Sequence, residues 1–415
     1  MRSKHSEVYL KEGVNLDKVL LGLQRRAVDR IILGPGTFFT QGAWAMDPTT
    51  HYQSVAGNVQ IIGQGKDRTT ILLRDPIVHT DNKRRPDVPI LRIGNLHQTA
   101  CGGGISGVTI DGDWKRNIGN CFVTVGARAF GSRMRFEDVR VRGVFGTYDS
   151  LPVQEGSVIK LQFEAFGIST MHVANLGGIK EDPDAPDDGG HIGKDCIVED
   201  TPEYSYLSPF SFGTTKMPGG RQWDCRRSQW INCFADVEPG NHAAFTLYHK
   251  THVIGGGSSG CQYAFYNDTD SVTDCLVEGG WHVIGYSAAT FVHGGGYLPM
   301  KENVVIRGTV FEFEKWKKSN GVAIGLALLR DPKKRIPESG FERIVMEGCR
   351  FQAGPEFTLF PFSTDAVSIK NVALRNCVEE AKWKAAPHFV GPVNGELEYV
   401  SNLGKREAFS TKTNL

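Results

Sequence analysis

Two clusters of acidic residues and histidine carry the side chains that glycan hydrolysis requires. In the first, an Asp-Asp pair precedes a Gly-Gly-His sequence, and in the second an Asp-Val-Glu sequence lies shortly before a histidine. Hydrolysis of a glycosidic bond uses paired carboxylates, one as the acid and the other as the base or nucleophile. A histidine beside such a pair can position it. The candidate catalytic residues are therefore Asp187, Asp188, His191, Asp236, Glu238 and His242.

Cations and aromatic rings surround the second cluster. Arg226 and Arg227 can hold a substrate carboxylate or the charge of a transition state, and the tryptophan faces suit the C–H face of a pyranose. If the reaction is β-elimination from a uronic acid, one of these arginines or Tyr248 is the candidate base. An Arg–Asp ion-pair network with tryptophans in the core is the structural alternative. The candidate substrate-binding residues are Trp223, Arg226, Arg227, Trp230, Tyr248 and His249.

A third acidic segment is the candidate metal site, with Asp268, Asp270 and Asp274 as the ligands. Ca²⁺ prefers carboxylate oxygens, so Ca²⁺ is the cofactor that this segment would bind, and no other cofactor is indicated. The segment lacks the Gly and the final Glu of an EF-hand loop. Asn and Asp also favour turns, so a coil turn is the alternative here, and a solvated loop is the alternative for the first acidic cluster.

Short β-strands are the elements that must position these residues. One helical pattern comes first, in which Leu16, Val19, Leu20 and Leu23 share a face behind an N-cap at Asn15. The rest of the chain consists of short runs rich in Val, Ile, Phe and Thr, separated by Gly, Asn and Asp, which predict strands. No second long helical pattern separates them, which excludes a doubly wound sheet and an α/β barrel.

A recurring phrase favours a parallel β-helix over a large antiparallel β-protein. An apolar–x–apolar sequence, then Asn or Gly, then Cys or an apolar residue, recurs in residues 230–237, 341–351 and 368–378. Coils of this kind bury their apolar faces only by stacking. We therefore expect an all-β solenoid closed at one end by the N-terminal capping helix. The predicted parts are an N-terminal extension (1–13), a single β-helix domain (14–403) with long loops near 74–89, 176–222 and 330–339, and a C-terminal tail (404–415).

Three N-terminal phrases resemble the first coils of the pectin-lyase-like superfamily, especially its pectate-lyase-type proteins. They are a strand ending in Pro-Gly-Thr-Phe (30–38), a strand of the form xIxGxGxxxTxI (59–72) and a coil with Thr-Ile-Asp-Gly (105–112). The resemblance covers about residues 14–112 and implies a right-handed parallel β-helix. Many members of that superfamily cleave, epimerise or bind acidic or complex polysaccharides, and many are trimeric viral tailspikes.

The Asp187–His191 cluster also resembles a polygalacturonase-type arrangement, which combines an Asp-Asp pair with a Gly-His-Gly element. In this chain the two elements abut instead of lying on separate coils. The accompanying Asn-Thr-Asp and Arg-Ile-Lys elements are absent in matching form. The resemblance therefore implies a role for these residues without defining the reaction.

Composition excludes several classes of partner. Lys plus Arg number 47 and Asp plus Glu 46, for a net charge of +1, which argues against a dedicated nucleic-acid binder. No apolar run is long enough for a membrane span. The first residues lack the apolar stretch of a classical signal peptide, so we expect a cytoplasmic, virion-associated or non-classically exported protein. Nine cysteines without a CxxC pair predict mostly reduced, buried thiols.

These observations together predict a polysaccharide-active enzyme, a lyase or a glycoside hydrolase, that binds an extended glycan along the β-helix. One alternative is a tailspike-type fibre, assembled as a homotrimer, that binds or depolymerises a host glycan. The other is a non-catalytic structural β-helix. The alternatives stay open because the fold supports many functions and the site decides between them.

Overall fold

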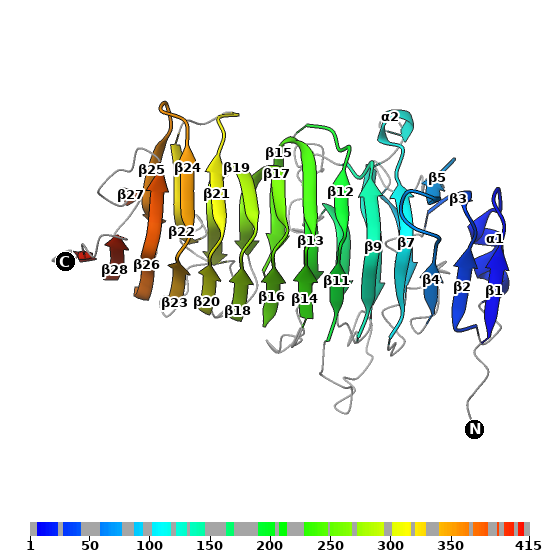
Figure 1. The fold of residues 1–415 in the computed structure, drawn as a ribbon, viewed down its shortest axis with the longest axis horizontal. Helices are drawn as coiled ribbons and strands as arrows, with labels where there is room; N and C mark the ends of the chain where they lie inside the picture. Colours follow the sequence, from blue (N-terminus) through cyan, green and yellow to red (C-terminus); the bar gives the residue numbers. More distant parts are fainter. Residues whose placement is uncertain are drawn as a thin grey trace, which may run out of the picture.

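The computed structural model describes residues 6–23, 28–42, 59–76, 87–93, 102–117, 122–130, 133–145, 163–169, 190–203, 207–213, 228–247, 250–267, 272–293, 301–316, 320–328, 340–364, 368–380, 388–389, 394–401 and 406–410. They form an elongated solenoid in which each coil stacks on the previous one (Figure 1). Within these residues every strand pairs in parallel with the next coil, except the last pair, β28 with β29. The architecture is a parallel β-helix, as the sequence predicted.

Each coil contributes strand segments to three sheet faces, here called faces A, B and C in chain order. Long strands bend through a corner and serve two faces, so the faces join into one continuous sheet. β7 and β26 pass from face A to face B, as does β9, and β15, β17 and β19 pass from face B to face C. One strand can thereby carry residues of a site on one face and of the core on the next.

The strand bounds follow the faces. Face A contains β1 (Glu7–Leu10), β2 (Arg30–Leu33), β4 (Gln60–Ile62), β7 (Gly104–Asp111), β9 (Arg135–Arg142), β11 (Ile192–Lys194), β14 (Ser228–Ile231), β16 (Thr251–Ile254), β18 (Val272–Glu278), β20 (Lys301–Arg307), β23 (Gly340–Glu347), β26 (Ser368–Glu380) and β28 (Asn394–Ser401). Face B adds β3 (Gly36–Thr40), β5 (Thr69–Leu73), β12 (Ile197–Glu199), β15 (Phe234–Thr246), β17 (Gly257–Asn267), β19 (Trp281–His293), β21 (Val310–Phe313) and β24 (Arg350–Ala353). Face C adds β6 (Asp87–Ile93), β8 (Phe122–Phe130), β10 (Phe163–Ser169), β13 (Leu207–Gly213), β22 (Asn320–Leu328), β25 (Thr358–Thr364) and β27 (His388–Phe389), and β29 (Arg406–Ser410) follows face A.

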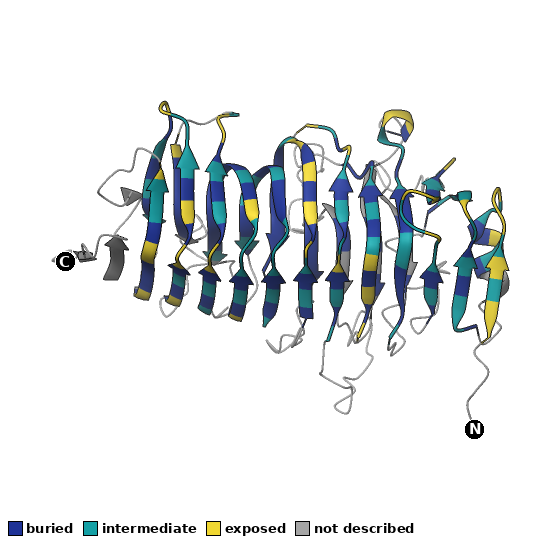
Figure 2. Cartoon of the chain, in the orientation of Figure 1, coloured by how far each residue is buried: buried dark blue, intermediate teal, exposed yellow. Residues whose placement is uncertain are grey.

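Alternation along each strand fills the core, because successive side chains point to opposite sides. The inward side chains stack from coil to coil in register, and on face C this produces a column of aromatic rings. Phe166, Phe210, Phe245 and Phe265 follow one another with ring centroids 5.5, 5.0 and 5.9 Å apart. All four are fully buried. Exposed residues alternate with buried ones along the strands (Figure 2).

The corner between faces A and B is a two-residue turn that repeats through the solenoid. In each described coil from β7 to β26 the first residue of this turn has a positive φ. Gly, Asn and Asp tolerate this backbone conformation best. Asn232 Nδ2 donates a 2.7 Å hydrogen bond to Asp195 Oδ1 of the previous turn. The turn residues are Gly107, Asp138, Asp195, Asn232, Gly255, Gly279, Gly308, Gly348 and Asn376.

The first end of the solenoid differs from the prediction. A helix is present as expected, α1 (Leu16–Leu23), and its Leu16 and Leu20 are buried. The helix has only eight residues. β1 precedes it in the chain and pairs with β2. The structure therefore does not show a helix that closes this end. A second helix, α2 (Trp114–Asn117), is a single turn after β7.

Several segments that were predicted to lie outside the strands contain strands in the structure. β1 lies within the predicted N-terminal extension, and β29 lies within the predicted C-terminal tail. The segment predicted as a loop at 176–222 contains β11, β12 and β13, two of which are only three residues long and leave little trace in the sequence. No helix within the described residues is long and apolar enough to span a membrane.

Candidate functional site

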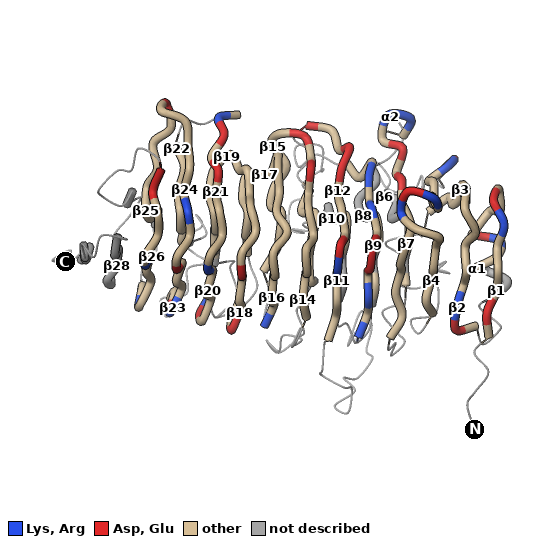
Figure 3. The backbone as a smooth tube through the Cα atoms, in the orientation of Figure 1, with Lys and Arg blue, Asp and Glu red and all other residues tan. Residues whose placement is uncertain are grey.

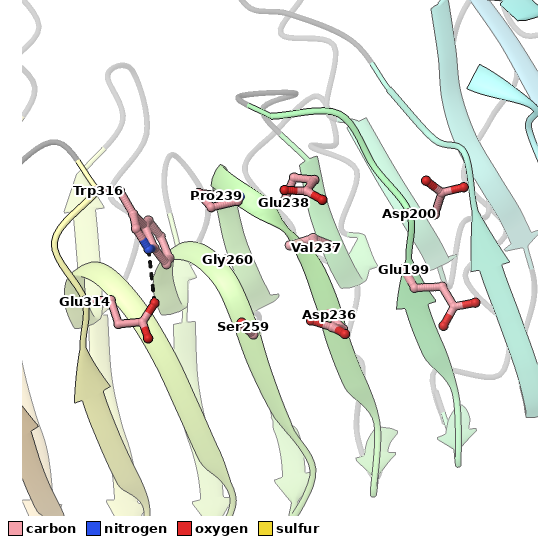
Figure 4. Close-up of a pocket in the computed structure, with 10 residues that line it drawn as sticks. All are labelled: Glu199, Asp200, Asp236, Val237, Glu238, Pro239, Ser259, Gly260, Glu314 and Trp316. Atoms are coloured by element: carbon pink, nitrogen blue, oxygen red, sulfur yellow. Dashed lines mark hydrogen bonds between the residues drawn. The ribbon is translucent and has the colours of Figure 1, made fainter. Parts of the chain in front are cut away.

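An acidic cleft of about 500 Å³ lies at the edge of face B where β12, β15 and β17 end or bend. Five carboxylates from three coils face it, with a tryptophan at one end (Figure 4). Acidic residues appear as red segments of the backbone around the upper parts of β12 and β15 (Figure 3). The lining residues are Glu199, Asp200, Asp236, Val237, Glu238, Pro239, Ser259, Gly260, Glu314 and Trp316.

Strand alternation aims the carboxylates outward. Along the start of β15, Phe234, Asp236 and Glu238 are exposed while the residues between them are buried. Asp236 pairs in register with Glu199 of β12 on one side and with Ser259 of β17 on the other. Sheet geometry therefore separates the Cα atoms of Glu199 and Asp236 by about 5 Å, and those of Asp236 and Glu238 by about 7 Å.

A bulge in β15 shapes the floor of the cleft. The register between β15 and β17 shifts between Asp236 and Asn241. Asn241 Nδ2 fixes the bulge by donating to the Glu238 carbonyl oxygen at 2.7 Å and to Thr201 Oγ1 at 3.2 Å. On the neighbouring coil Gly260 has a φ of +90°, and a Cβ there would lie 1.8 Å from the Val237 carbonyl oxygen. Only glycine fits, and β17 can then approach the bulge closely.

Three of the five carboxylates have polar partners. Glu199 forms an ion pair with Arg140 at 3.0 Å, Asp200 accepts a hydrogen bond from Trp114 Nε1 at 3.1 Å, and Glu314 accepts one from Trp316 Nε1 at 3.3 Å. Within the described part of the chain, no hydrogen bond or ion pair joins the carboxylates of Asp236 and Glu238 to another side chain. These two acids are therefore the groups in the cleft that are free to react with a ligand.

Two predicted site residues lie in the core, so their predicted roles at a surface site are corrected. His191 is fully buried, and its Nδ1 accepts a 3.2 Å hydrogen bond from the Met134 backbone N–H. Trp230 is also fully buried, with its ring 4.5 Å from that of Phe212. The Trp230 ring occupies space that exists because residue 193 is glycine, whose Cβ would lie 1.9 Å from the ring. Neither side chain can contact a polysaccharide.

His242 lies further along β15, past the bulge, where this strand has reached face C. Its side chain is 7% exposed. Its Nδ1 is 3.3 Å from Ser208 Oγ, and its ring meets those of Tyr266 and Tyr263 edge-on at 4.4 and 5.3 Å. Tyr263 also contacts Tyr286, whose pKa is raised by burial. We call these four residues, His242, Tyr263, Tyr266 and Tyr286, the His–Tyr cluster.

The predicted metal segment is described only at Asp274. This residue has a positive φ at a bend within β18, and its Oδ1 accepts a 2.9 Å hydrogen bond from Asn303 Nδ2 of the next coil. Asp274 therefore acts as a turn residue, which was the predicted alternative to metal binding. Within the residues that the structure describes, no group of three or more His, Cys, Asp or Glu side chains could hold a metal ion.

The remaining predicted site residues lie outside the described part of the chain, so the structure does not place them. They are Asp187, Asp188, Trp223, Arg226, Arg227, Tyr248, His249, Asp268 and Asp270.

Sequence reasoning selected Asp236 and Glu238 correctly as neighbours at one surface but missed Glu199, Glu314 and Trp316. The alternation of partly buried and buried residues was the signal for the two glutamates, in β12 for Glu199 and in β21, which ends just before Glu314. Each strand has only three or four residues, which is too short for that alternation to be recognised alone.

Comparison with protein families and with curated proteins found no match. Solved structures match over most of the chain. The A-module of Azotobacter vinelandii mannuronan C-5 epimerase AlgE6 superposes with a TM-score of 0.54 at 12% identity, covering 94% of this chain and 96% of that one. The tailspike protein of E. coli bacteriophage HK620 gives 0.59 at 10% identity over 92% and 62% of the two chains. The catalytic domain of a GH87 α-1,3-glucanase gives 0.50 at 9% identity over 95% and 70%.

At these identities the likeness concerns the fold. The chain has the parallel β-helix fold of pectin-lyase-like proteins, which confirms the resemblance predicted from residues 14–112. The similar structures include enzymes that act on glycans and a phage tailspike. The function of this chain depends on its own site.

Proposed function

We propose that this protein is a polysaccharide-active enzyme whose reaction takes place in the acidic cleft. The observation that carries the proposal is the pair Asp236 and Glu238, which are exposed on one strand and have no side-chain partner in the described residues. Two free carboxylates side by side repel each other and gain nothing for stability, whereas a glycosidase needs them for catalysis. The glycan-active enzymes that share the fold support this proposal.

The spacing suits hydrolysis. Asp236 and Glu238 point to the same side of β15 with Cα atoms about 7 Å apart, and an inverting acid–base pair needs two carboxyl groups that can hold a water molecule between them. One carboxylic acid donates its proton to the leaving oxygen, while the other carboxylate removes a proton from the water as the water attacks. Glu199 lies closer to Asp236, about 5 Å away at Cα, but its ion pair with Arg140 holds its carboxylate in place. We therefore assign the acid and the base to Asp236 and Glu238.

The His–Tyr cluster supports a second candidate reaction, β-elimination from a uronic acid. A tyrosine or histidine can remove the proton next to a carboxyl group, and the His242 ring lies 4.4 Å from that of Tyr266. The candidates at Arg226, Arg227 and Tyr248 would supply the cation and a further base. This reaction leaves an unsaturated uronate that absorbs in the ultraviolet, so it is easily distinguished from hydrolysis.

A tailspike-type fibre is the alternative from a different class, supported by the fold shared with a phage tailspike. In that case the same surface binds a host glycan, and three chains assemble. An SDS-resistant species with three times the chain mass of 45.7 kDa would favour the fibre.

A polysaccharide panel tests the proposal. The purified protein is incubated with neutral and acidic polysaccharides, with Ca²⁺ and with chelator, and both reducing ends and ultraviolet absorbance are read. We expect reducing ends without new absorbance. Asp236→Asn and Glu238→Gln should each lower kcat by about 10²- to 10⁴-fold, since each removes one proton-transfer group, with melting temperatures close to the parent because both side chains are exposed.

Glu347→Gln is the matched control, since this exposed glutamate lies on face A, away from the cleft. It should keep full activity. New ultraviolet absorbance would instead assign the reaction to elimination, and activity within a few-fold of the parent in both cleft variants would refute the proposed roles. No reducing ends and no absorbance on any polysaccharide would favour a binding or structural β-helix.

A further inference from the structure

Two exposed aromatic side chains stand on face B beside the acidic cleft. Trp281 is 55% exposed and Phe234 is 38% exposed, on strands whose inward aromatic residues are fully buried. Phe234 pairs in register with Gly257, and Gly257 pairs with Trp281. The two rings therefore occupy one outward row, two coils or about 10 Å apart. Exposed bands are visible on β15 and β19 (Figure 2).

The glycine between them makes the two rings one surface. A Cβ on Gly257 would lie 2.9 Å from Phe234 Cε2, so the Phe234 ring leans over β17 toward Trp281. The same Cβ would lie 2.0 Å from the Trp281 carbonyl oxygen, so no side chain can interrupt the row. An apolar surface of this kind, bordered by polar residues, is typical of a binding site.

The repeat of this surface matches an extended polysaccharide. In a β-1,4-linked chain each pyranose advances by about the spacing of one coil, and alternate rings present the same face. A glycan that lies along the solenoid axis would therefore place the C–H faces of every second sugar on Phe234 and Trp281. Asp236 is two residues beyond Phe234 on the same outward side of β15, so the carboxylates of the cleft would flank such a glycan.

The charge of the cleft selects against acidic glycans. Glu199, Asp200, Asp236, Glu238 and Glu314 contribute five carboxylates to one small volume. Arg140, the cation that forms an ion pair with a carboxylate of the cleft in the described residues, is shared between Glu199 and Asp67, at 3.0 and 2.7 Å. A polyuronate would bring further negative charge into this field, which opposes association.

We infer that the substrate of the cleft is a neutral, extended glycan with a two-residue repeat, of the β-1,4-linked hexosan type, stacked on Phe234 and Trp281. This inference rests on the proposed function for the cleavage step, while the binding itself stands on the aromatic row and the charge of the cleft.

Binding by the inactive Glu238→Gln protein tests the inference separately from catalysis. Calorimetry is performed with cellohexaose, mannohexaose and hexa-mannuronate at low salt. We expect one of the two neutral oligosaccharides to bind and hexa-mannuronate not to bind. Adding Trp281→Ala or Phe234→Ala should weaken binding by about tenfold, because each removes an apolar surface that the sugar covers. Tyr9→Ala is the matched control, since this exposed tyrosine lies on β1 at the first coil, and it should bind as the parent does.

Each other result has one meaning. The inference would be overturned if hexa-mannuronate alone binds or if no oligosaccharide binds. It would also be overturned if a neutral oligosaccharide binds equally well to both aromatic variants. A Trp281→Ala protein that loses self-association and not glycan binding would also overturn it, because the row would then be a contact between copies of the chain. If a neutral glycan binds through the aromatic row but the parent never cleaves it, the inference stands and the proposed enzyme does not. If a polyuronate is cleaved and both aromatic variants cleave it normally, the enzyme stands and the inference fails.

Discussion

Asp236 and Trp230 lie on consecutive strands of one coil, yet the first side chain reaches solvent and the second is sealed in the core. Residue type alone predicted a position at the surface for both, and the structure places only Asp236 there. The deciding information is the phase of alternation, since Trp230 and Ser228 share the inward side of β14. His191 was misplaced for the same reason. For an aromatic residue or a histidine on a β-helix, the side of the strand, facing the core or the solvent, must be known before a function is assigned.

One buried histidine makes stability depend on pH. His282 is fully buried among Phe245, Phe265 and Phe311, and its Nδ1 lies 2.9 Å from Ser258 Oγ. Burial lowers the pKa of His282 from 6.5 to about 3. The unfolded chain therefore takes up a proton below pH 6.5 that the folded protein does not bind until about pH 3, so the free energy of unfolding falls as pH falls through this window.

We expect the loss to reach about 1.4 kcal/mol for each pH unit below 6.5. The measurement is the melting temperature between pH 7 and pH 4.5, for the parent and for His282→Phe. The variant can lose stability at pH 7 because Ser258 loses its partner, so the slopes with pH are compared. A variant as sensitive to acid as the parent would show that other groups carry the effect.

At the scale of the element, the bulge of β15 depends on the neighbouring coil. Gly260→Ala would place a Cβ against the Val237 carbonyl oxygen at a φ of +90°. We expect a loss of several kcal/mol and a distorted cleft, observed as a lower melting temperature and lower activity. Gly255→Ala is the matched control, with a φ of +62° and no atom within 4 Å of the new Cβ. It should cost only about 1 kcal/mol. Equal losses in the two variants would mean that the close approach of β17 does not hold the bulge.

The aromatic column of face C gives a second prediction for an element. Phe245 is fully buried between Phe210 and Phe265, so Phe245→Ala leaves a cavity and should cost about 3–5 kcal/mol. Phe234→Ala removes an exposed ring from the same strand and should cost far less. Denaturant unfolding of both variants makes the comparison, and a small loss at Phe245 would show that the column collapses around the gap.

Local patterns were sufficient to predict the strands and their stacking, because runs such as 30–33, 69–73 and 135–142 each carry their own β-pattern. The site was only partly predictable. Asp236 and Glu238 share one strand, so their proximity is visible in the sequence. Glu199 joins them only through register with the next coil, and Trp316 only through the ends of more distant coils. Register between coils depends on the lengths of the connecting segments, which the sequence pattern does not determine.

For the whole molecule, the last described coil faces the problem of an open sheet edge. Among the described strands, β29 folds back on β28 as an antiparallel pair with five residue pairs in register. It covers an edge of β28 that would otherwise be free to bind another strand. We expect removal of residues 404–415 to expose β28 and to promote self-association. Light scattering against the intact chain checks this. A truncated chain that remains as dispersed as the parent would show that β29 is not needed to protect this edge.

The repeated turn between faces A and B also sets the phase of the cleft. On the central coils two residues separate the last face-A pair from the first face-B pair, as Asn232 and Cys233 do between Ile231 and Phe234. A third residue inserted there would shift alternation by one and turn Phe234, Asp236 and Glu238 toward the core. The length of this corner therefore determines which side chains of β15 reach the surface. A one-residue insertion would change the function of the strand without altering any of its residues.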